Sequence, residues 1–359
     1  MPSSMSGTTT LRRAERHVSL YTDLATTIRE SGLLRRRYAY YWTRITAAVA
    51  AFALIWVVVV TLGNSWFVLV CAGVLGVVIA QFGFLGHDGA HRQIFKSAAW
   101  NDWTSRLLSG LFIGLSYGWW KTKHNRHHAA PNQVGRDPDI ESGILAFTPE
   151  IAHSRRTGIR GWVVERQGWL FFPLLTLEGL NLHVASIRTL LTRRAMPHQR
   201  VEALLVLGRM AAYIIVLLLL LPLGKASAFF GIQMAIFGLA LGGSFAPNHK
   251  GMPMVPADMK VDFLRRQVLM SRNIRGGILV DFAMGGLNYQ IEHHLFPSMP
   301  RPNLATAQPI VRGYCRQHHV DYTETGLFES YGIVIRYLNQ VGLRGQDTFA
   351  CPLVSMYRT

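Results

Sequence analysis

The sequence is poor in cysteine, with three in 359 residues. Cys71, Cys315 and Cys351 form no Cys-x-x-Cys pair, so we expect neither a disulfide framework nor a cysteine zinc site. No Gly-rich fingerprint follows a strand-like run, which speaks against hydride-type dinucleotide cofactors. The N-terminus lacks a short apolar region followed by a small-residue cleavage site, so no secretory signal is expected.

Acidic residues are also scarce. The chain has 20 aspartates and glutamates against 37 lysines and arginines, a formal net charge of +17 and a pI near 10.4. Such a basic chain fits nucleic acid, an anionic membrane surface, or acidic partners and phosphorylated substrates. No motif that reads nucleic acid is present, whereas long apolar runs are, so we expect a membrane protein that binds no nucleic acid.

Two apolar regions each have the length of a transmembrane hairpin. Residues 45–86 are nearly uncharged and too long for one span across a hydrocarbon core of about 30 Å. Gly63-Asn64-Ser65 is the natural break, and residues 201–246 repeat this plan around Pro222 to Lys225. We therefore expect four spans, at about 45–62, 66–86, 203–221 and 226–246.

The basic residues predict how these hairpins are oriented. The two expected turns hold only Lys225, and nearly all arginines lie in the other segments, which the positive-inside rule assigns to the cytoplasm. The shorter apolar stretches 107–120 and 168–182 are expected to be interfacial or re-entrant, because a crossing at 107–120 would separate histidines that lie on either side of it. We expect an all-α integral membrane protein of the inner cell membrane or the endoplasmic reticulum, with interfacial helices and a cytosolic helical cap. Its expected parts are a basic N-terminal segment (1–44), a membrane domain (45–335) and a C-terminal tail (336–359).

Eight histidines lie beside the cytosolic ends of these spans. Two of them are spaced i, i+4, and a second cluster is spaced i, i+3, i+4, which places its three imidazoles on one helical face. Imidazole is the commonest metal-ligating side chain, and eight imidazoles exceed what one metal needs. A histidine-rich centre for two metals is therefore expected from His87, His91, His124, His127, His128, His249, His293 and His294.

Each cluster alone has a plainer interpretation. The first pair could face lipid headgroups, His249 could be a polar cap at a helix exit, and adjacent residues such as His293 and His294 diverge on a helix. The occurrence of all eight histidines on one side of the membrane favours metal binding over these interpretations. Two acids could orient the ligand imidazoles through the free ring N–H, namely Asp88 and Glu292. The same role is open to Asn132, Asp137 and Asp139, for which a solvated turn is the alternative. The remaining histidines lack such spacing and are expected at surface or interfacial positions: His17, His153, His183, His198, His318 and His319.

The ordered motifs HDGAH, HNRHH and QIEHH resemble the three histidine boxes of membrane fatty acid desaturases, and with the hairpins the resemblance covers roughly residues 45–310. It implies two iron ions that activate O2, two electrons from an external donor, and removal of two hydrogens from an acyl chain. His249 matches a further family histidine between the second and third boxes. Gln290 resembles the front-end desaturases, which place a new double bond between an existing one and the carboxyl end. Many of these carry a fused b-type cytochrome domain with an HPGG motif, which this sequence lacks, so a separate ferredoxin- or cytochrome-type donor is expected.

We therefore expect an O2-dependent desaturase acting on an acyl-CoA or an acyl-lipid, with the eight histidines as iron ligands. Gln290 would lie beside the metals as a weak ligand or hydrogen-bond donor, and Asp88 would orient a ligand. Aromatic residues near the second box are candidates either for an acyl tunnel or for packing against lipid: Phe112, Tyr117, Trp119 and Trp120. The alternatives are a lipid hydroxylase on the same scaffold and, in another class, a membrane metal-binding or transport protein. Transport would place histidines inside the spans, which are almost free of ionisable residues.

Overall fold

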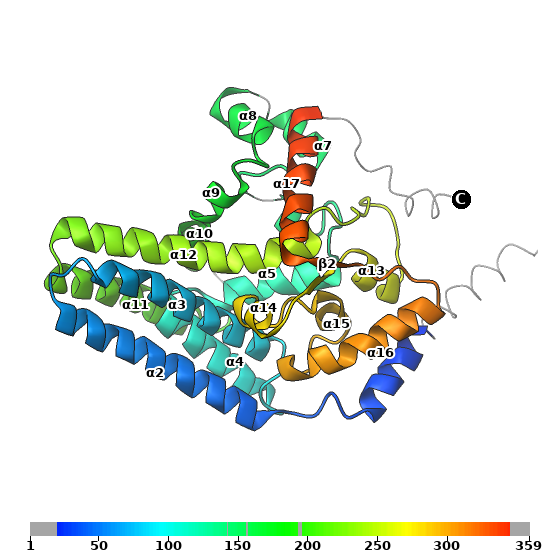
Figure 1. The fold of residues 1–359 in the computed structure, drawn as a ribbon, viewed down its shortest axis with the longest axis horizontal. Helices are drawn as coiled ribbons and strands as arrows, with labels where there is room; N and C mark the ends of the chain where they lie inside the picture. The colour runs from blue at the N-terminus through cyan, green and yellow to red at the C-terminus, as the bar shows by residue number, and fades with distance from the viewer. Residues whose placement is uncertain (1–19, 142, 156, 193–195, 345–359) are drawn as a thin grey trace, which may run out of the picture.

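The computed structural model describes residues 20–141, 143–155, 157–192 and 196–344. Among these residues, four helices are long and apolar enough to cross a membrane: α2 (Tyr38–Leu62), α3 (Val68–Ala90), α11 (Gln199–Leu220) and α12 (Leu223–His249). They form an elongated bundle, and most of the remaining helices gather at one end of it (Figure 1). The expected all-α membrane fold with four spans is confirmed.

Both helical hairpins turn at the same end of the bundle. The first turn follows Gly63, whose φ of 52° ends α2 in a conformation that glycine adopts readily. The Lys225 Nζ donates to Asn64 Oδ1 over 2.8 Å, which joins the two turns. At the opposite end each helix continues beyond the expected range; α2, for example, begins at Tyr38, inside the segment expected to end at residue 44. A helix does not stop where its apolar run stops, because its backbone hydrogen bonds continue into the polar boundary layer.

Helices α3 and α12 lie closest together and form the centre of the bundle. At Gly76 a side-chain Cβ would lie 2.8 Å from the Gln233 carbonyl oxygen, so the close approach of the two helices requires glycine. Small residues at such contacts are typical of helix pairs in membranes. The buried Gln233 amide is satisfied by Tyr213, whose hydroxyl donates to its Oε1 over 3.0 Å.

The segment after α3 is a broken helix and not a fifth span. It consists of α4 (Ala98–Leu107), a π-helical turn η1 (Leu108–Ile113) and α5 (Tyr117–Ala129). Gly114, with φ of 93°, ends the π-helical turn, and Ser116 caps α5 by accepting from the Trp119 N–H. Phe112 packs face to face on Phe82 of α3 with ring centroids 4.3 Å apart, so one side of this stretch packs against the bundle, while Leu107 and Leu111 are exposed.

The start of α5 is fixed by a buried carboxylate on α11. Glu202 accepts from the Ser116 hydroxyl at 2.5 Å, from the Gly118 N–H at 3.1 Å and from Arg106 Nε at 3.1 Å. Its side chain is 1% exposed and that of Arg106 is 6% exposed. One acid therefore holds α4, α5 and α11 together at the end where the histidines lie.

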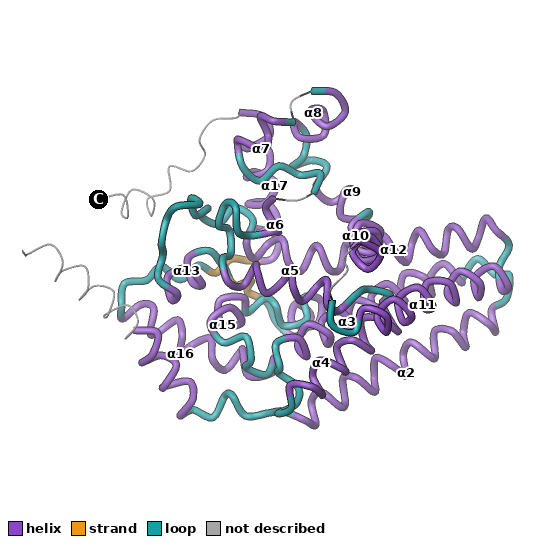
Figure 2. Tube along the Cα trace, turned by 180° about the vertical axis from the view of Figure 1, so that it is seen from behind, coloured by secondary structure: helices purple, strands orange, loops and turns teal. Residues whose placement is uncertain are grey.

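Two smaller bodies complete the protein. One contains α6 (Pro138–Glu141), α7 (Pro149–Ser154), α8 (Gly158–Glu165), α9 (Phe171–Leu175) and α17 (Leu327–Arg344), which crosses the boundary expected at residue 335. Helix α10 (Glu178–Thr192) follows and packs on the spans α11 and α12. The other is a cap at the end of the bundle (Figure 2). It contains a helix over 20–30, α13 (Phe263–Leu269), α14 (Ile278–Ala283), α15 (Gln290–Leu295), the 3-10 turn η2 (Arg301–Asn303) and α16 (Leu304–Gln317). Strands β1 (Asn273–Arg275) and β2 (Glu324–Gly326) pair in parallel within it.

Candidate metal centre

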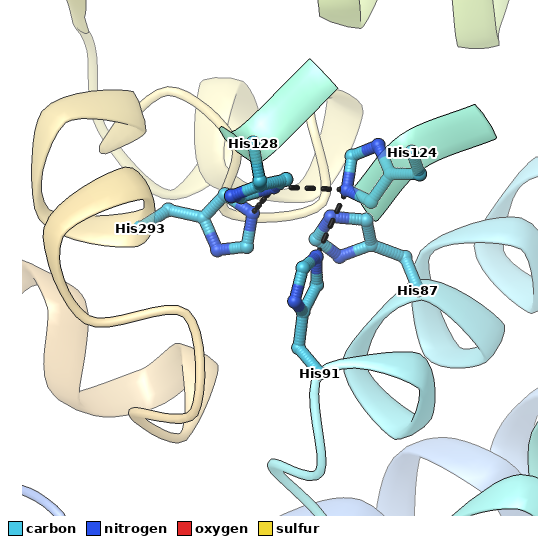
Figure 3. Close-up of side chains that lie close together, drawn as sticks. All are labelled: His87, His91, His124, His128 and His293. Atoms are coloured by element: carbon cyan, nitrogen blue, oxygen red, sulfur yellow. Dashed lines mark hydrogen bonds between the residues drawn. The ribbon is translucent and has the colours of Figure 1, made fainter. Parts of the chain in front are cut away.

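Five imidazoles from three helical segments converge on one point (Figure 3). Each offers a ring nitrogen, and these nitrogens lie within 4.8 Å of one another. Two come from the end of α3, two from α5 and one from α15. We call this set the five-histidine group: His87, His91, His124, His128 and His293.

Three further imidazoles converge directly beside the first five. His127 of α5, His249 at the end of α12 and His294 of α15 form the three-histidine group, again with nitrogens within 4.8 Å of one another. The two groups touch, since the rings of His128 and His294 stack with centroids 4.2 Å apart. All eight histidines of the sequence clusters are therefore brought together, as five and three.

The distances between the ring nitrogens suit a shared cation. Nε2 of His124 lies 2.9 Å from Nε2 of His91 and 3.0 Å from Nε2 of His128, and the Nε2 atoms of His127 and His249 are 3.3 Å apart. Two nitrogens that are each about 2.1 Å from one metal and at right angles to each other would be about 3.0 Å apart. The residues therefore fit one metal ion in each group.

The two helices that carry adjacent histidines divide them between the groups. On α5, His124 and His128 are one turn apart and join the five-histidine group, while His127 points to the other group. On α15, His293 and His294 separate in the same way. Successive residues on a helix differ by about 100° in direction. The three α5 histidines thus lie on one side of the helix, as expected from their spacing, and are divided between the two adjacent groups.

Polar partners fix the rings of the three-histidine group. His127 Nδ1 lies 3.1 Å from both carboxylate oxygens of Asp137, and His249 Nδ1 lies 3.0 Å from the Met270 carbonyl oxygen. His294 Nδ1 lies 2.9 Å from Gln267 Oε1. Each Nδ1 faces an oxygen acceptor and so carries the proton, which leaves each Nε2 lone pair directed to the common point.

Burial keeps most of these imidazoles neutral. It lowers the pKa of His91 to about 3, with further contributions from Lys121 and His127. Burial together with neighbouring imidazoles lowers the pKa far below its ordinary value in His124, His128, His293 and His294. Neutral imidazole is the form that binds metal. His127 differs: burial lowers its pKa, but the charges of Asp137 and Asp139 and the Asp137 hydrogen bond together raise it above the ordinary value.

Gln290 lies at the three-histidine group, with its Nε2 2.9 Å from His249 Nε2. Its Oε1 accepts from Asn248 Nδ2 at 3.2 Å. The Asn248 amide is itself oriented by the Ser244 and Leu287 carbonyl oxygens, to which it donates over 2.9 and 3.1 Å. With its oxygen placed towards Asn248, Gln290 turns its NH2 group to the histidines.

The acidic residues of the first and third motifs are tied to the cap. Asp88 Oδ1 is 3.6 Å from His87 Nδ1, and its Oδ2 pairs with Arg301 Nη2 at 2.5 Å. Asp88 therefore contacts both its neighbouring histidine and the segment after α15. Glu292 does not take the orienting role considered for it, because its carboxylate accepts from Asn273 Nδ2 and the Tyr322 hydroxyl, both at 2.7 Å.

The turn after α5 serves the histidines as well as the backbone. Asp137 accepts from the backbone N–H groups of Asn132 and Asp139, over 2.8 and 2.9 Å, in addition to His127. Asn132 Nδ2 donates to the His249 carbonyl oxygen over 3.1 Å. Gln267 was not identified from the sequence; its Nε2 donates to the His128 carbonyl oxygen over 3.0 Å while its Oε1 holds His294. A single glutamine outside any repeat gives no sequence signal.

The candidate tunnel residues separate into different environments. Trp120 stacks on His124 with centroids 4.5 Å apart and lies 5.7 Å from the His87 ring. Tyr117 instead donates to Asp102 and is 2% exposed, and Phe112 packs on α3 as described above. Phe245, which the sequence did not single out, lies 6.2 Å from the ring of His87.

One of the other histidines is not where it was expected. His183 is 4% exposed, and its two ring nitrogens lie 2.7 Å from the Gly179 and 3.1 Å from the Ile113 carbonyl oxygens. The surface or interfacial assignment of His183 is therefore wrong; it joins α10 to the end of the π-helical turn. His17 lies outside the described residues.

Comparisons with known proteins agree with this arrangement. Residues 64–326 match the family model described as fatty acid desaturase. The chain is 30% identical over 318 residues to an acyl-lipid (9-3)-desaturase of Physcomitrium patens, covering 86% of this chain and 60% of that protein. It is 26% identical to a delta(8)-fatty-acid desaturase of Helianthus annuus, covering 79% and 65%, and 28% identical to a delta(6)-fatty-acid desaturase of Caenorhabditis elegans, covering 90% and 75%. The chain thus spans less than two thirds of the length of the Physcomitrium patens and Helianthus annuus proteins. By the family match and by its similarity to these relatives, the chain belongs to the fatty acid desaturase family.

Proposed function

We propose that this protein desaturates a fatty acyl chain, carried by CoA or by a lipid, with O2 at a di-iron centre. The observation that carries the proposal is the pair of touching histidine groups, five and three, at one end of a four-helix membrane bundle. Its relatives are named as acyl-lipid and fatty acid desaturases.

The ligand assignment follows the two groups. One iron would be held by the five-histidine group and the other by the three-histidine group, so that all eight histidines are ligands. The irons, when bound, supply the O2 chemistry that removes hydrogen from an unactivated C–H bond, which no side chain can do alone. The chain's own contribution is to hold the imidazoles neutral, oriented and shielded from water.

Gln290 has a role of its own beside the second iron. Three imidazoles leave a coordination position open, as in catalytic metal sites with three protein ligands. Because the Gln290 oxygen accepts from Asn248, its NH2 group faces this position. Gln290 therefore acts as a hydrogen-bond donor at the centre and not as a ligand.

The acyl chain would approach through the aromatic side of the five-histidine group. Trp120 covers His124, and Phe245 lies 6.3 Å from the same ring. These largely apolar rings suit contact with a hydrocarbon chain, and they would exclude water from the reacting carbons. Asp88 contacts both His87 and Arg301, and would thereby orient the His87 ring within this group.

The orientation and the electron donor follow from charge. Among the described residues, Lys225 is the basic residue of the two hairpin turns, while the arginines lie towards the histidine end. We therefore place the histidine end in the cytoplasm, at the inner cell membrane or the endoplasmic reticulum. Two electrons per turnover would come from a separate ferredoxin- or cytochrome-type protein, which the basic surface attracts.

Lipid analysis of cells that express the chain tests the proposal. Mass spectrometry should show an acyl product lighter by two hydrogens, and derivatisation locates the new double bond. His127→Ala should abolish this product, whereas His153→Ala, which changes an exposed histidine of α7, should not. A product that has gained an oxygen would overturn desaturation in favour of hydroxylation. Active protein without iron would overturn the di-iron centre.

A further inference from the structure

The short helix α14 exposes nearly all of its apolar surface. Ile278 is 81% exposed, Leu279 is 80% exposed and Phe282 is 45% exposed, and none of the six residues of α14 is buried. Among the described residues, nothing covers these side chains. A soluble surface rarely carries such a set of contiguous apolar residues without a partner.

The single charged residue of α14 points away from this surface. Asp281 accepts from Asn288 Nδ2 over 2.7 Å, and Asn288 is 1% exposed. The helix therefore has an apolar outer side and a polar inner side that is satisfied by the protein. This polarity is what a helix at a lipid surface needs.

Helix α14 continues the lipid-facing side of a span. On α3 the exposed residues Val70, Val74 and Val77 follow one another at helical spacing, and the next position of that stripe is Gln81. Gln81 Nε2 donates to the Phe282 carbonyl oxygen over 3.2 Å. Figure 1 shows α14 in front of the end of α3, between the bundle and the cap.

The depth of this contact lies within a bilayer core. Gln81 comes 13 residues after Val68, the first residue of α3, which at 1.5 Å per residue is about 20 Å along the helix. A hydrocarbon core is about 30 Å thick. Ser244 of α12 contacts the other end of α14 nearer the membrane boundary: it lies 21 residues after Leu223, the first residue of α12, and its Oγ is 3.1 Å from the Ala283 carbonyl oxygen.

We propose that α14 is a membrane-inserted helix, with Ile278, Leu279 and Phe282 among the acyl chains of the same bilayer that the four spans cross. The partner is lipid because the exposed face is continuous with the apolar stripe of α3 and carries no charge. The proposal goes beyond the reaction and rests on the membrane fold alone.

Insertion would also fix the third histidine motif relative to the bilayer. Helix α14 leads to α15 through Gly285 and Gly286, whose φ angles of 59° and 77° favour glycine. A side chain at Gly285 would collide with the Phe84 ring of α3. This short glycine turn connects α14 to the helix that carries His293 and His294, so the position of α14 in the membrane would determine the position of α15.

Fluorescence quenching by lipid tests the insertion directly. Leu279→Cys is labelled with bimane in a Cys71→Ala, Cys351→Ala background; Cys315 is buried and is left in place. The protein is placed in nanodiscs of phosphatidylcholine with or without brominated acyl chains. Val74→Cys, on the exposed stripe of α3, is the lipid-facing control, and Gln317→Cys, exposed at the end of α16, is the control in the cap.

We expect quenching at Leu279 to be closer to that at Val74 than to that at Gln317. Bromines near the carboxyl end of the acyl chain should quench it more than bromines near the methyl end, because interfacial helices bury their apolar face only about 5–10 Å deep. Quenching no greater than at Gln317 would overturn the proposal. So would cross-linking of Leu279→Cys between two copies in place of quenching, which would identify a second chain as the partner. If Leu279→Cys does not fold, bimane quenching is measured at Phe282→Cys, for which the same result is expected.

Discussion

Asp137→Asn tests how the three-histidine group is built. Asp137 is fully buried, and its carboxylate receives three donors: His127 Nδ1 at 3.1 Å, the Asn132 N–H at 2.8 Å and the Asp139 N–H at 2.9 Å. Asparagine has the same shape but only one acceptor oxygen. One of the three donors must then face an NH2 group, and His127 loses the charge that orients it.

The expected size of the effect follows from comparable partners of metal ligands. Loss of a carboxylate behind a ligand histidine typically weakens metal binding about 10–100-fold, which corresponds to about 1.4–2.7 kcal/mol. The unsatisfied buried donor would also cost about 1–3 kcal/mol of folding free energy. We therefore expect Asp137→Asn to fold, to keep the iron of the five-histidine group and to lose most of the other.

The assay is iron per chain, measured by mass spectrometry after equilibration with a series of chelator concentrations. Asp139→Asn is the matched control, because Asp139 is one-third exposed, pairs chiefly with Lys123 at 2.8 Å and lies 3.4 Å from His127 Nδ1. It should release iron at chelator concentrations close to those of the unchanged protein. If Asp137→Asn retains two irons as firmly as the unchanged protein, Asp137 does not support a ligand and the assignment of His127 fails with it.

Three further substitutions test other parts of the structure. Gln290→Leu should retain two irons per chain but lower the rate of acyl desaturation, because the donor facing the open position is lost; a loss of iron would instead make Gln290 a ligand. Glu202→Gln removes the carboxylate that pairs directly with buried Arg106 and should cost about 3–5 kcal/mol, seen as a lower midpoint of thermal unfolding; an unchanged midpoint would contradict the buried pair. Tyr322→Phe removes one of two donors to the buried Glu292 carboxylate. It should lower the free energy of unfolding by about 1.5–3 kcal/mol, and with it the midpoint of thermal unfolding, and leave the iron content unchanged. Iron loss in this variant would show that Glu292 acts on the metals after all.

The four spans could be predicted from the sequence because a span depends on few physical properties. Length and hydropathy determine a span, and Gly63 and Pro222 mark the turns where no side-chain pattern continues. The helix ends could not be predicted to the residue, since they depend on tertiary contacts. Helix α2, for instance, begins near Tyr41, whose hydroxyl donates to Gln93 Oε1 over 2.9 Å, and nothing in the local sequence indicates this partner.

The convergence of the eight histidines could be predicted from the sequence, whereas the residues that support them could not. Histidine spacing identifies the imidazoles, because few other functions place so many at helical intervals. Glu202, Gln267 and Arg301 act on the histidine helices from 70 or more residues away in sequence, or from loops without a repeating pattern. Their partners exist only after the chain has folded, so no local pattern could have revealed them. The burial of His183 was missed for the same reason, because its contact with the Ile113 carbonyl oxygen joins residues 70 positions apart in the sequence.

The adjacent histidines explain why this site holds two groups and not one. A pair such as His293 and His294 is a weak signal for a single metal, because neighbouring side chains on a helix point about 100° apart. That divergence is what a two-metal centre requires: α15 sends one histidine to each group, so one rigid element sets the separation of both. Helix α5 does the same with His127 and His128. Inserting one residue before either pair would rotate both histidines away together and weaken both groups, whereas substituting a single histidine would weaken only one group. The two kinds of change should therefore differ in iron retention against a chelator, with both irons held more weakly after the insertion and only one after the substitution.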